Sequence, residues 1–158
     1  PPFGGDTLFA SQNAAYAALS DGMKRLLAGL HAVNASTKAD ASRTREDLVR
    51  EDGRSKVITD YTATHPVVRT HPETGRKALY VNPGHTVRFD RMSKDESGPL
   101  LEYLYRHQTR PEFTCRFTWQ PGSLSLWDNR CAQHNPVKDY HGYRRVPPGI
   151  TPAGAQPR

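Results

Sequence analysis

The sequence predicts a mainly β fold with flanking helices, of the β-sandwich or jelly-roll kind. Apolar and polar residues alternate through residues 113–119 and again through 123–127, the period of half-buried strands. Pro121 and Gly122 separate these segments and predict a hairpin between them. The 158 residues include 13 prolines and 12 glycines, so turns should be frequent.

Further strands are expected at residues 7–10, 57–64, 66–69 and 77–81, where β-branched residues gather or alternate. The turn-forming segment 71–76 separates the last two strands, so they should form a second hairpin.

Helices are expected in three places. Ser11 can cap a helix over residues 12–19, and Ser20 can cap a second helix that extends to about Asn34. In the second helix, apolar residues recur at helical spacing: Met23, Leu26, Leu27, Leu30 and Val33. A third helix over residues 97–108 should end before Pro111. Residues 35–57 have no apolar period and are interpreted as a mobile surface loop.

Composition argues against two classes of partner. The formal net charge is +6, from 22 basic and 16 acidic residues, but acids interleave with the bases through residues 42–56. We therefore expect no nucleic-acid partner. No apolar stretch approaches the roughly 20 residues that span a bilayer, so no membrane partner is expected. Cys115 and Cys131 lack metal-ligand spacing and predict reduced, core or near-core thiols in a cytoplasmic protein.

Seven histidines invite a metal hypothesis. Non-haem iron oxygenases hold Fe(II) with two histidines and one carboxylate, often with two of these ligands in an HxD or HxE motif. The sequence contains one such motif, His71-Pro72-Glu73, and His134 could complete a formal triad. However, the surrounding turn residues place the motif at a hairpin tip, where its side chains should face solvent.

His134 and Arg145 form a second candidate pair. His134 follows a predicted strand, and eleven residues later Arg145 lies on what should be the next strand. An antiparallel return of that length can bring both side chains into one pocket. A guanidinium binds carboxylates in bidentate fashion, so a histidine-bound metal beside it would suit a chelating keto-diacid.

Several segments resemble the taurine/alpha-ketoglutarate dioxygenase family, in the family's order. They are GGDTLFA at residues 4–10, HPVVRTHPETGRKALYVN at 65–82, RPEFTCRFTWQPG at 110–122, WDNRCAQH at 127–134 and DYHGYRR at 139–145. The resemblance implies a double-stranded β-helix (jelly roll), with residues 1–158 as the C-terminal portion of a single dioxygenase domain and residues 35–57 as a mobile lid.

The resemblance also implies cofactors and roles. His134 would be an iron ligand, Arg145 would pair with the distal carboxylate of 2-oxoglutarate, Thr7 would contact that cosubstrate, and Trp127 would line the pocket. The implied enzyme uses Fe(II), 2-oxoglutarate and molecular oxygen to hydroxylate a small, anionic organic substrate, with release of succinate and CO2. A homo-oligomer is compatible with the family.

Three departures from the family pattern qualify these expectations. The family's HxD motif precedes the GGDT turn, so the fold should be incomplete at the N-terminus and two iron ligands are absent from the sequence. Gly149 stands where taurine enzymes have a basic residue, and His85 stands where they have a packing aromatic. Taurine is therefore disfavoured as substrate, and the alternative is a catalytically inactive fragment of such an enzyme.

Overall fold

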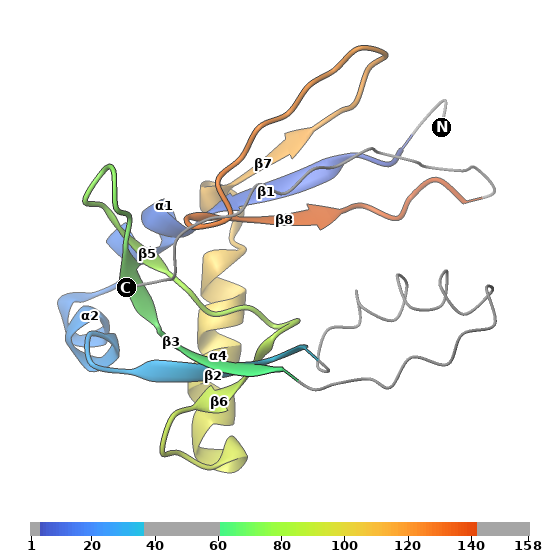
Figure 1. The fold of residues 1–158 in the computed structure, drawn as a ribbon. Coiled ribbons are helices and arrows are strands. Elements are labelled where there is room, and N and C mark those ends of the chain that lie inside the picture. Colours follow the sequence, from blue (N-terminus) through green and yellow to red (C-terminus); the bar gives the residue numbers. More distant parts are fainter. Residues whose placement is uncertain (1–3, 37–60, 142–158) are drawn as a thin grey trace.

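The computed structural model describes residues 4–36 and 61–141. In this part of the chain, two three-stranded antiparallel sheets and a two-stranded hairpin are accompanied by α-helices (Figure 1). The expectation of a mainly β protein with flanking helices is confirmed. The two larger sheets are separate rather than closed into one barrel.

The first sheet has the strand nearest the start of the chain at its centre. Strand β1 (Thr7–Ser11) lies between β7 (Thr114–Phe117) and β8 (Ala132–Pro136), and both pairings are antiparallel. The sheet therefore joins segments more than 100 residues apart in the sequence. These strands lie side by side in Figure 1.

The second sheet has the order β3-β2-β6. Its strands are β3 (Thr62–Pro66), β2 (His31–Ala35) and β6 (Thr86–Phe89). The neighbouring hairpin pairs β4 (Val68–Thr70) with β5 (Lys77–Leu79), as the turn residues between them predict.

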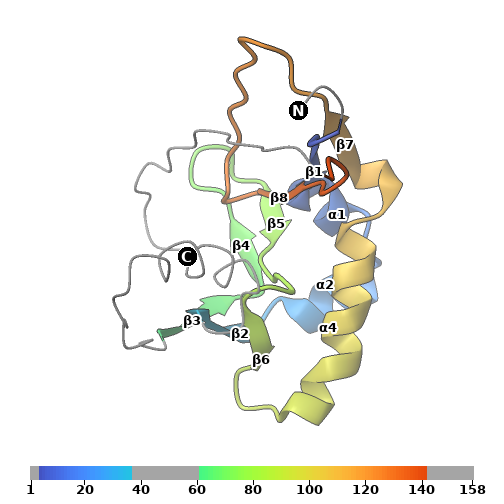
Figure 2. The ribbon, with the colours of Figure 1, turned by 90° about the vertical axis from the view of Figure 1, so that its right-hand side faces the viewer.

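The helices begin at serine caps. Ser11 caps α1 (Gln12–Ala17) and Ser20 caps α2 (Asp21–Leu27), as expected. The long helix α4 (Lys94–Gln108) begins three residues earlier than predicted, because Ser93 and Glu96 form a reciprocal capping box. Figure 2 shows α4 running along one side of the molecule, from the level of β6 to that of β7.

The apolar core lies between the helices, the second sheet and the hairpin. Its buried members come from six elements and the segments beside them: Ala15, Leu19, Leu27, Ala32, Val67, Leu79, Val81, Phe89, Leu101 and Leu104. The first sheet adds Ala10, and is otherwise attached to the core by α1, which continues directly from β1.

The hairpin predicted over residues 113–127 is wrong. Phe113 ends a single 3-10 turn, η2 (Pro111–Phe113), and β7 pairs with β1 rather than with residues 123–127. Those residues form no strand, and Leu124 and Leu126 are 80% and 88% exposed. The alternation of apolar and polar residues identified β7 correctly as an extended segment. This pattern carries no information about which strand pairs with β7.

The second helix is shorter than predicted. It ends at Leu27, and residues 31–35 form β2 instead. A register shift between Val33 and Asn34 places Ala32 and Ala35, three residues apart, both in buried positions. Val33, the last residue of the predicted helical spacing, is only half-buried in this strand.

Other segments predicted from the sequence lie only partly within the described residues. Ala35 ends β2, and residues 37–57 of the expected lid lie outside the described residues, as do 57–60 of the strand expected at 57–64. Cys115 is exposed and Cys131 half-buried, so Cys115 is not the core thiol that was expected; both are free. None of the described helices is long and apolar enough to cross a bilayer.

A substitution at Leu104 tests where the apolar core lies. This residue is fully buried on α4, so Leu104→Ala in the intact protein should lower the free energy of unfolding by about 2–5 kcal/mol. Leu126→Ala, at a residue 88% exposed, should change it by no more than about 0.5 kcal/mol. Chemical denaturation followed by circular dichroism measures both, and equal losses would contradict this description of the core.

Candidate active site

The register of the first sheet places Thr7, Phe9 and His134 on one face. Thr7 and Phe9 are two residues apart on β1, and successive strand side chains alternate between faces. His134 lies directly opposite Phe9 on β8. The centres of their rings are 6.4 Å apart. The structure therefore brings two of the predicted site residues, Thr7 and His134, to the same side of the sheet.

Trp127 joins this face from the loop before β8. Its ring centre lies 5.0 Å from that of His134 and 5.2 Å from that of Phe9, with tilted planes in both cases. Its indole N–H donates to Asn129 Oδ1 at 2.9 Å. Trp127, predicted to line the metal pocket, thus contacts the predicted metal ligand directly.

The environment of His134 favours a neutral imidazole. The residue is exposed at the surface, but partial burial of its ring lowers its pKa below the usual value of 6.5. A neutral imidazole has a ring nitrogen with a free lone pair, which is the form that binds metals. The described residues include no group of three potential ligands that contains His134.

Thr7 is 4% exposed, and its hydroxyl oxygen accepts a hydrogen bond from the Trp119 indole at 3.0 Å. Trp119 was predicted only as one of several residues on a strand face. The structure gives it a definite contact with a predicted cosubstrate-binding residue, and no sequence spacing pointed to that contact.

A charge network holds the strand ends near Thr7. Arg116 on β7 donates to Asp6 at 2.5 Å and to Asp139 at 2.9 Å, and the Gly5 amide donates to Asp139 at 2.6 Å. These bonds join the segments before β1 and after β8 to β7. They also engage the Asp6 carboxylate in an ion pair with Arg116.

Glycine is required at the start of this network. Gly4 and Gly5 have φ angles of +69° and +73°, a region that favours glycine. A Cβ at Gly4 would lie 2.6 Å from Asp139 Oδ1. The Gly-Gly turn therefore lets the backbone approach Asp139 closely enough for the amide bond at Gly5.

The prediction that His71 faces solvent is wrong. His71 is only 6% exposed, because the loop before β8 folds over the hairpin tip, and its Nε2 lies 2.9 Å from Asp128 Oδ2. Glu73 does lie at the surface, where it pairs with Arg130 at 2.8 Å. The formal triad of His71, Glu73 and His134 is not among the groups of potential ligands that the described residues bring together.

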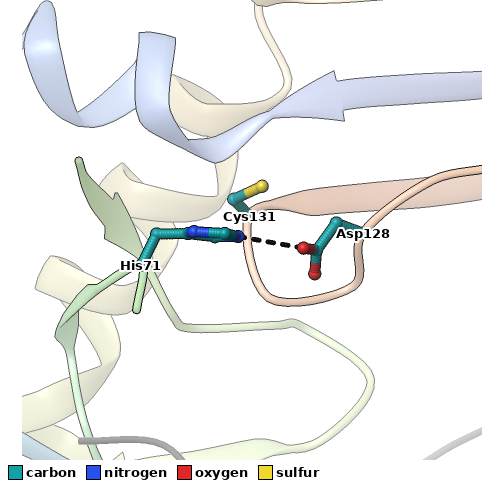
Figure 3. Close-up of side chains that lie close together, drawn as sticks. All are labelled: His71, Asp128 and Cys131. Atoms are coloured by element: carbon teal, nitrogen blue, oxygen red, sulfur yellow. Dashed lines mark hydrogen bonds and ion pairs between the residues drawn. The ribbon is translucent and has the colours of Figure 1, made fainter. Parts of the chain in front are cut away.

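His71, Asp128 and Cys131 do form such a group, with potential ligand atoms within 4.8 Å of one another (Figure 3). Their chemistry opposes a metal ion. The Arg130 guanidinium already donates to both Asp128 oxygens and holds the pKa of that carboxyl far below its usual value. Burial raises the pKa of the Cys131 thiol, which disfavours the thiolate that binds metals. The group is better described as a hydrogen-bonded contact between two loops.

Arg69 is a buried residue that the sequence did not single out. It is 4% exposed, and its guanidinium lies over the Tyr80 ring at 4.8 Å from the ring centre. Its Nε has no hydrogen-bond partner among residues 4–36 and 61–141. Burial, and then the charge of Arg69, lower the pKa of the neighbouring His65.

A hollow of about 370 Å³ opens beside Phe9, on the side of the sheet toward α1. Both cysteines and Phe113 border it, whereas Thr7, Trp127 and His134 do not. It is therefore not the cavity that was expected to contain His134 and Arg145. Arg145 lies outside the described residues, so its shared cavity with His134 stays a prediction.

Comparison with known proteins identifies the class of protein. Residues 1–147 match the family described as "Taurine catabolism dioxygenase TauD, TfdA family". The chain belongs to this family, as its motifs predicted.

Two curated relatives cover nearly the whole chain. An alpha-ketoglutarate-dependent sulfate ester dioxygenase of Pseudomonas putida is 38% identical over 99% of the chain and 53% of its own length. An alkylsulfatase of Acinetobacter baylyi is 40% identical over 98% of the chain and 49% of its own length. The chain thus spans about half the length of these relatives.

Solved structures of dioxygenases support the same family assignment. A taurine dioxygenase from Burkholderia xenovorans superposes with a TM-score of 0.71 at 36% identity, over 88% of this chain and 44% of that one. AAD-2, solved with Mn(II) and N-oxalylglycine, gives a TM-score of 0.71 at 29% identity, over 92% of this chain and 56% of that one.

The bond between Trp119 and Thr7 can be tested by a double-mutant cycle. Trp119→Phe and Thr7→Val each remove one partner, and the coupling free energy should be about 0.5–1.5 kcal/mol, the net value of such a bond. Urea denaturation of the four proteins measures it. Additive single effects would show that this hydrogen bond does not form.

Proposed function

We propose that this chain is the C-terminal portion of a single dioxygenase domain with a double-stranded β-helix fold, and that the intact protein hydroxylates a small organic anion. The observation that carries the proposal is the placement of His134 on the face of the first sheet shared with Thr7, in contact with Trp127. These residues come from segments that match the family motifs. The family match over residues 1–147 supports the same conclusion.

His134 suits the role of an iron ligand. Its ring is partly exposed, its pKa is lowered by burial, and Trp127 and Phe9 limit the orientations of the imidazole. When bound, Fe(II) and 2-oxoglutarate would supply the oxidising chemistry, with succinate and CO2 as by-products. The protein would supply the remaining ligands from outside the described residues.

The other predicted residues would bind and orient 2-oxoglutarate. Thr7 would contact a carboxylate of the cosubstrate through its hydroxyl, which Trp119 holds in place. Arg145 would pair with the distal carboxylate through two parallel N–H bonds. The aromatic rings of Phe9 and Trp127 would keep water from this side of the site.

The names of the two curated relatives described above, a sulfate ester dioxygenase and an alkylsulfatase, favour an organic sulfate ester as substrate. Each of these relatives covers nearly the whole chain. Gly149, at the position where taurine enzymes have a basic residue, argues against taurine. We therefore expect alkyl sulfates to be turned over faster than taurine.

His134 provides the central test. In the intact protein with Fe(II) and 2-oxoglutarate, an alkyl sulfate should stimulate succinate formation, and His134→Ala should abolish it because the metal loses a protein ligand. Quantified succinate and product measure this. His141→Ala, a nearby imidazole without an assigned role, serves as the control. A wild-type protein that binds neither Fe(II) nor 2-oxoglutarate would favour the inactive alternative.

Arg145 is tested separately by cosubstrate binding. Arg145→Ala should weaken 2-oxoglutarate binding by about 2–5 kcal/mol, because a buried carboxylate loses its charged, bidentate partner. Isothermal titration of the anaerobic protein measures this. Arg144→Ala is the matched control, since on the strand that the sequence predicts there, the side chains of adjacent residues would point to opposite faces. Equal losses in the two variants would remove the assignment of Arg145.

A further inference from the structure

The loop contact between the β4–β5 hairpin and the segment before β8 contains one buried imidazole, that of His71. The Thr74 amide donates to His71 Nδ1 at 3.3 Å, so in this bond Nδ1 is an acceptor. Because the Asp128 carboxylate can only accept, His71 Nε2 donates to Asp128 Oδ2 at 2.9 Å, and Nδ1 also lies 3.3 Å from Glu73 Oε2 (Figure 3). His71 thereby fixes the position of one Asp128 oxygen.

Arg130 strengthens the same contact from the exposed side. Its Nη2 donates to Asp128 Oδ2 at 2.6 Å, and its Nη1 donates to Glu73 at 2.8 Å on the hairpin turn. Because Glu73 is 62% exposed, that ion pair should contribute little, and the buried His71 bond is the more specific part of the contact.

Asp128 in turn shapes the chain that leads into β8. Its Oδ1 accepts from the Arg130 amide at 2.8 Å, and its carbonyl accepts from the amides of Cys131 at 3.1 Å and Ala132 at 2.9 Å. Ala132 is the first residue of β8, two residues before His134. Trp127, which packs on the His134 ring, directly precedes Asp128.

We propose that His71 is a positioning residue for His134, acting through Asp128 and the turn that places the Trp127 ring against the imidazole. The inference rests on the proposed function for the role of His134 as a metal ligand. The hairpin tip, which belongs to a different sheet, would then help to orient that ligand. Interactions that orient metal ligands commonly affect metal affinity 10–100-fold.

The test uses the intact protein with Mn(II) as the probe metal. His71→Leu removes the donor to Asp128, and His71→Gln retains an N–H at a similar position. Calorimetry should show Mn(II) affinity reduced about 10-fold in His71→Leu and largely restored in His71→Gln. In protein labelled with 5-fluorotryptophan, the 19F resonance of Trp127, assigned with Trp127→Phe, should shift in His71→Leu but not in His71→Gln.

His107→Leu is the matched control. His107 is also 6% exposed and binds one partner, the Ala15 carbonyl at 2.8 Å, on the other side of the core. The His107→Leu variant should have a lower melting temperature, with an unchanged Trp127 resonance and an unchanged Mn(II) affinity. If His71→Leu behaves in the same way, His71 is merely structural and the proposal is overturned.

A second variant keeps the test decisive if His71→Leu does not fold. Arg130→Gln, at a residue 30% exposed, loosens the same turn and should shift the same resonance and weaken Mn(II) binding; unchanged values would overturn the proposal. If His134→Ala binds Mn(II) as tightly as the wild type, the proposed function fails instead. The Trp127 resonance would still report whether His71 positions the turn.

Discussion

The candidate site depends on one constraint, the central position of β1 between β7 and β8. Each pairing is antiparallel and in register over at least four residues. A slip of one residue along β8 would move His134 to the opposite face of the sheet, away from Phe9 and Trp127. The Gly4-Gly5 turn and the Arg116 network hold the end of the sheet near Thr7, so they help to fix that register.

The sheet that carries His134 is attached to the apolar core by α1 and by a few polar contacts, one of which comes from α1 itself. The Asn13 side chain donates to the Lys77 carbonyl, and the Gln133 side chain donates to the Val81 carbonyl. The hairpin adds the bond from His71 to Asp128. Because most core residues belong to the helices, the second sheet and the hairpin, overall stability and the geometry near His134 can vary separately. A variant that lowers only the stability of the core, such as His107→Leu, can therefore be distinguished from one that changes the geometry near His134.

Among the described residues around the site, two arginines each form ion pairs with two carboxylates. Arg116 bridges Asp6 and Asp139, and Arg130 bridges Asp128 and Glu73. In both cases one guanidinium joins two carboxylates from different segments. These arginines therefore act as connections between loops.

The sequence by itself determined the family, the β1, β5 and α1 segments, the caps at Ser11 and Ser20, and the identity of the candidate ligand His134. These features depend on neighbouring residues or on motif strings, which a sequence contains in full. Only the tertiary structure decided that β7 pairs with β1, that residues 31–35 form a strand, and that His71 is buried against Asp128. Strand pairing and burial depend on segments distant in sequence, and alternation or turn residues specify neither the partner of a strand nor what covers a hairpin tip.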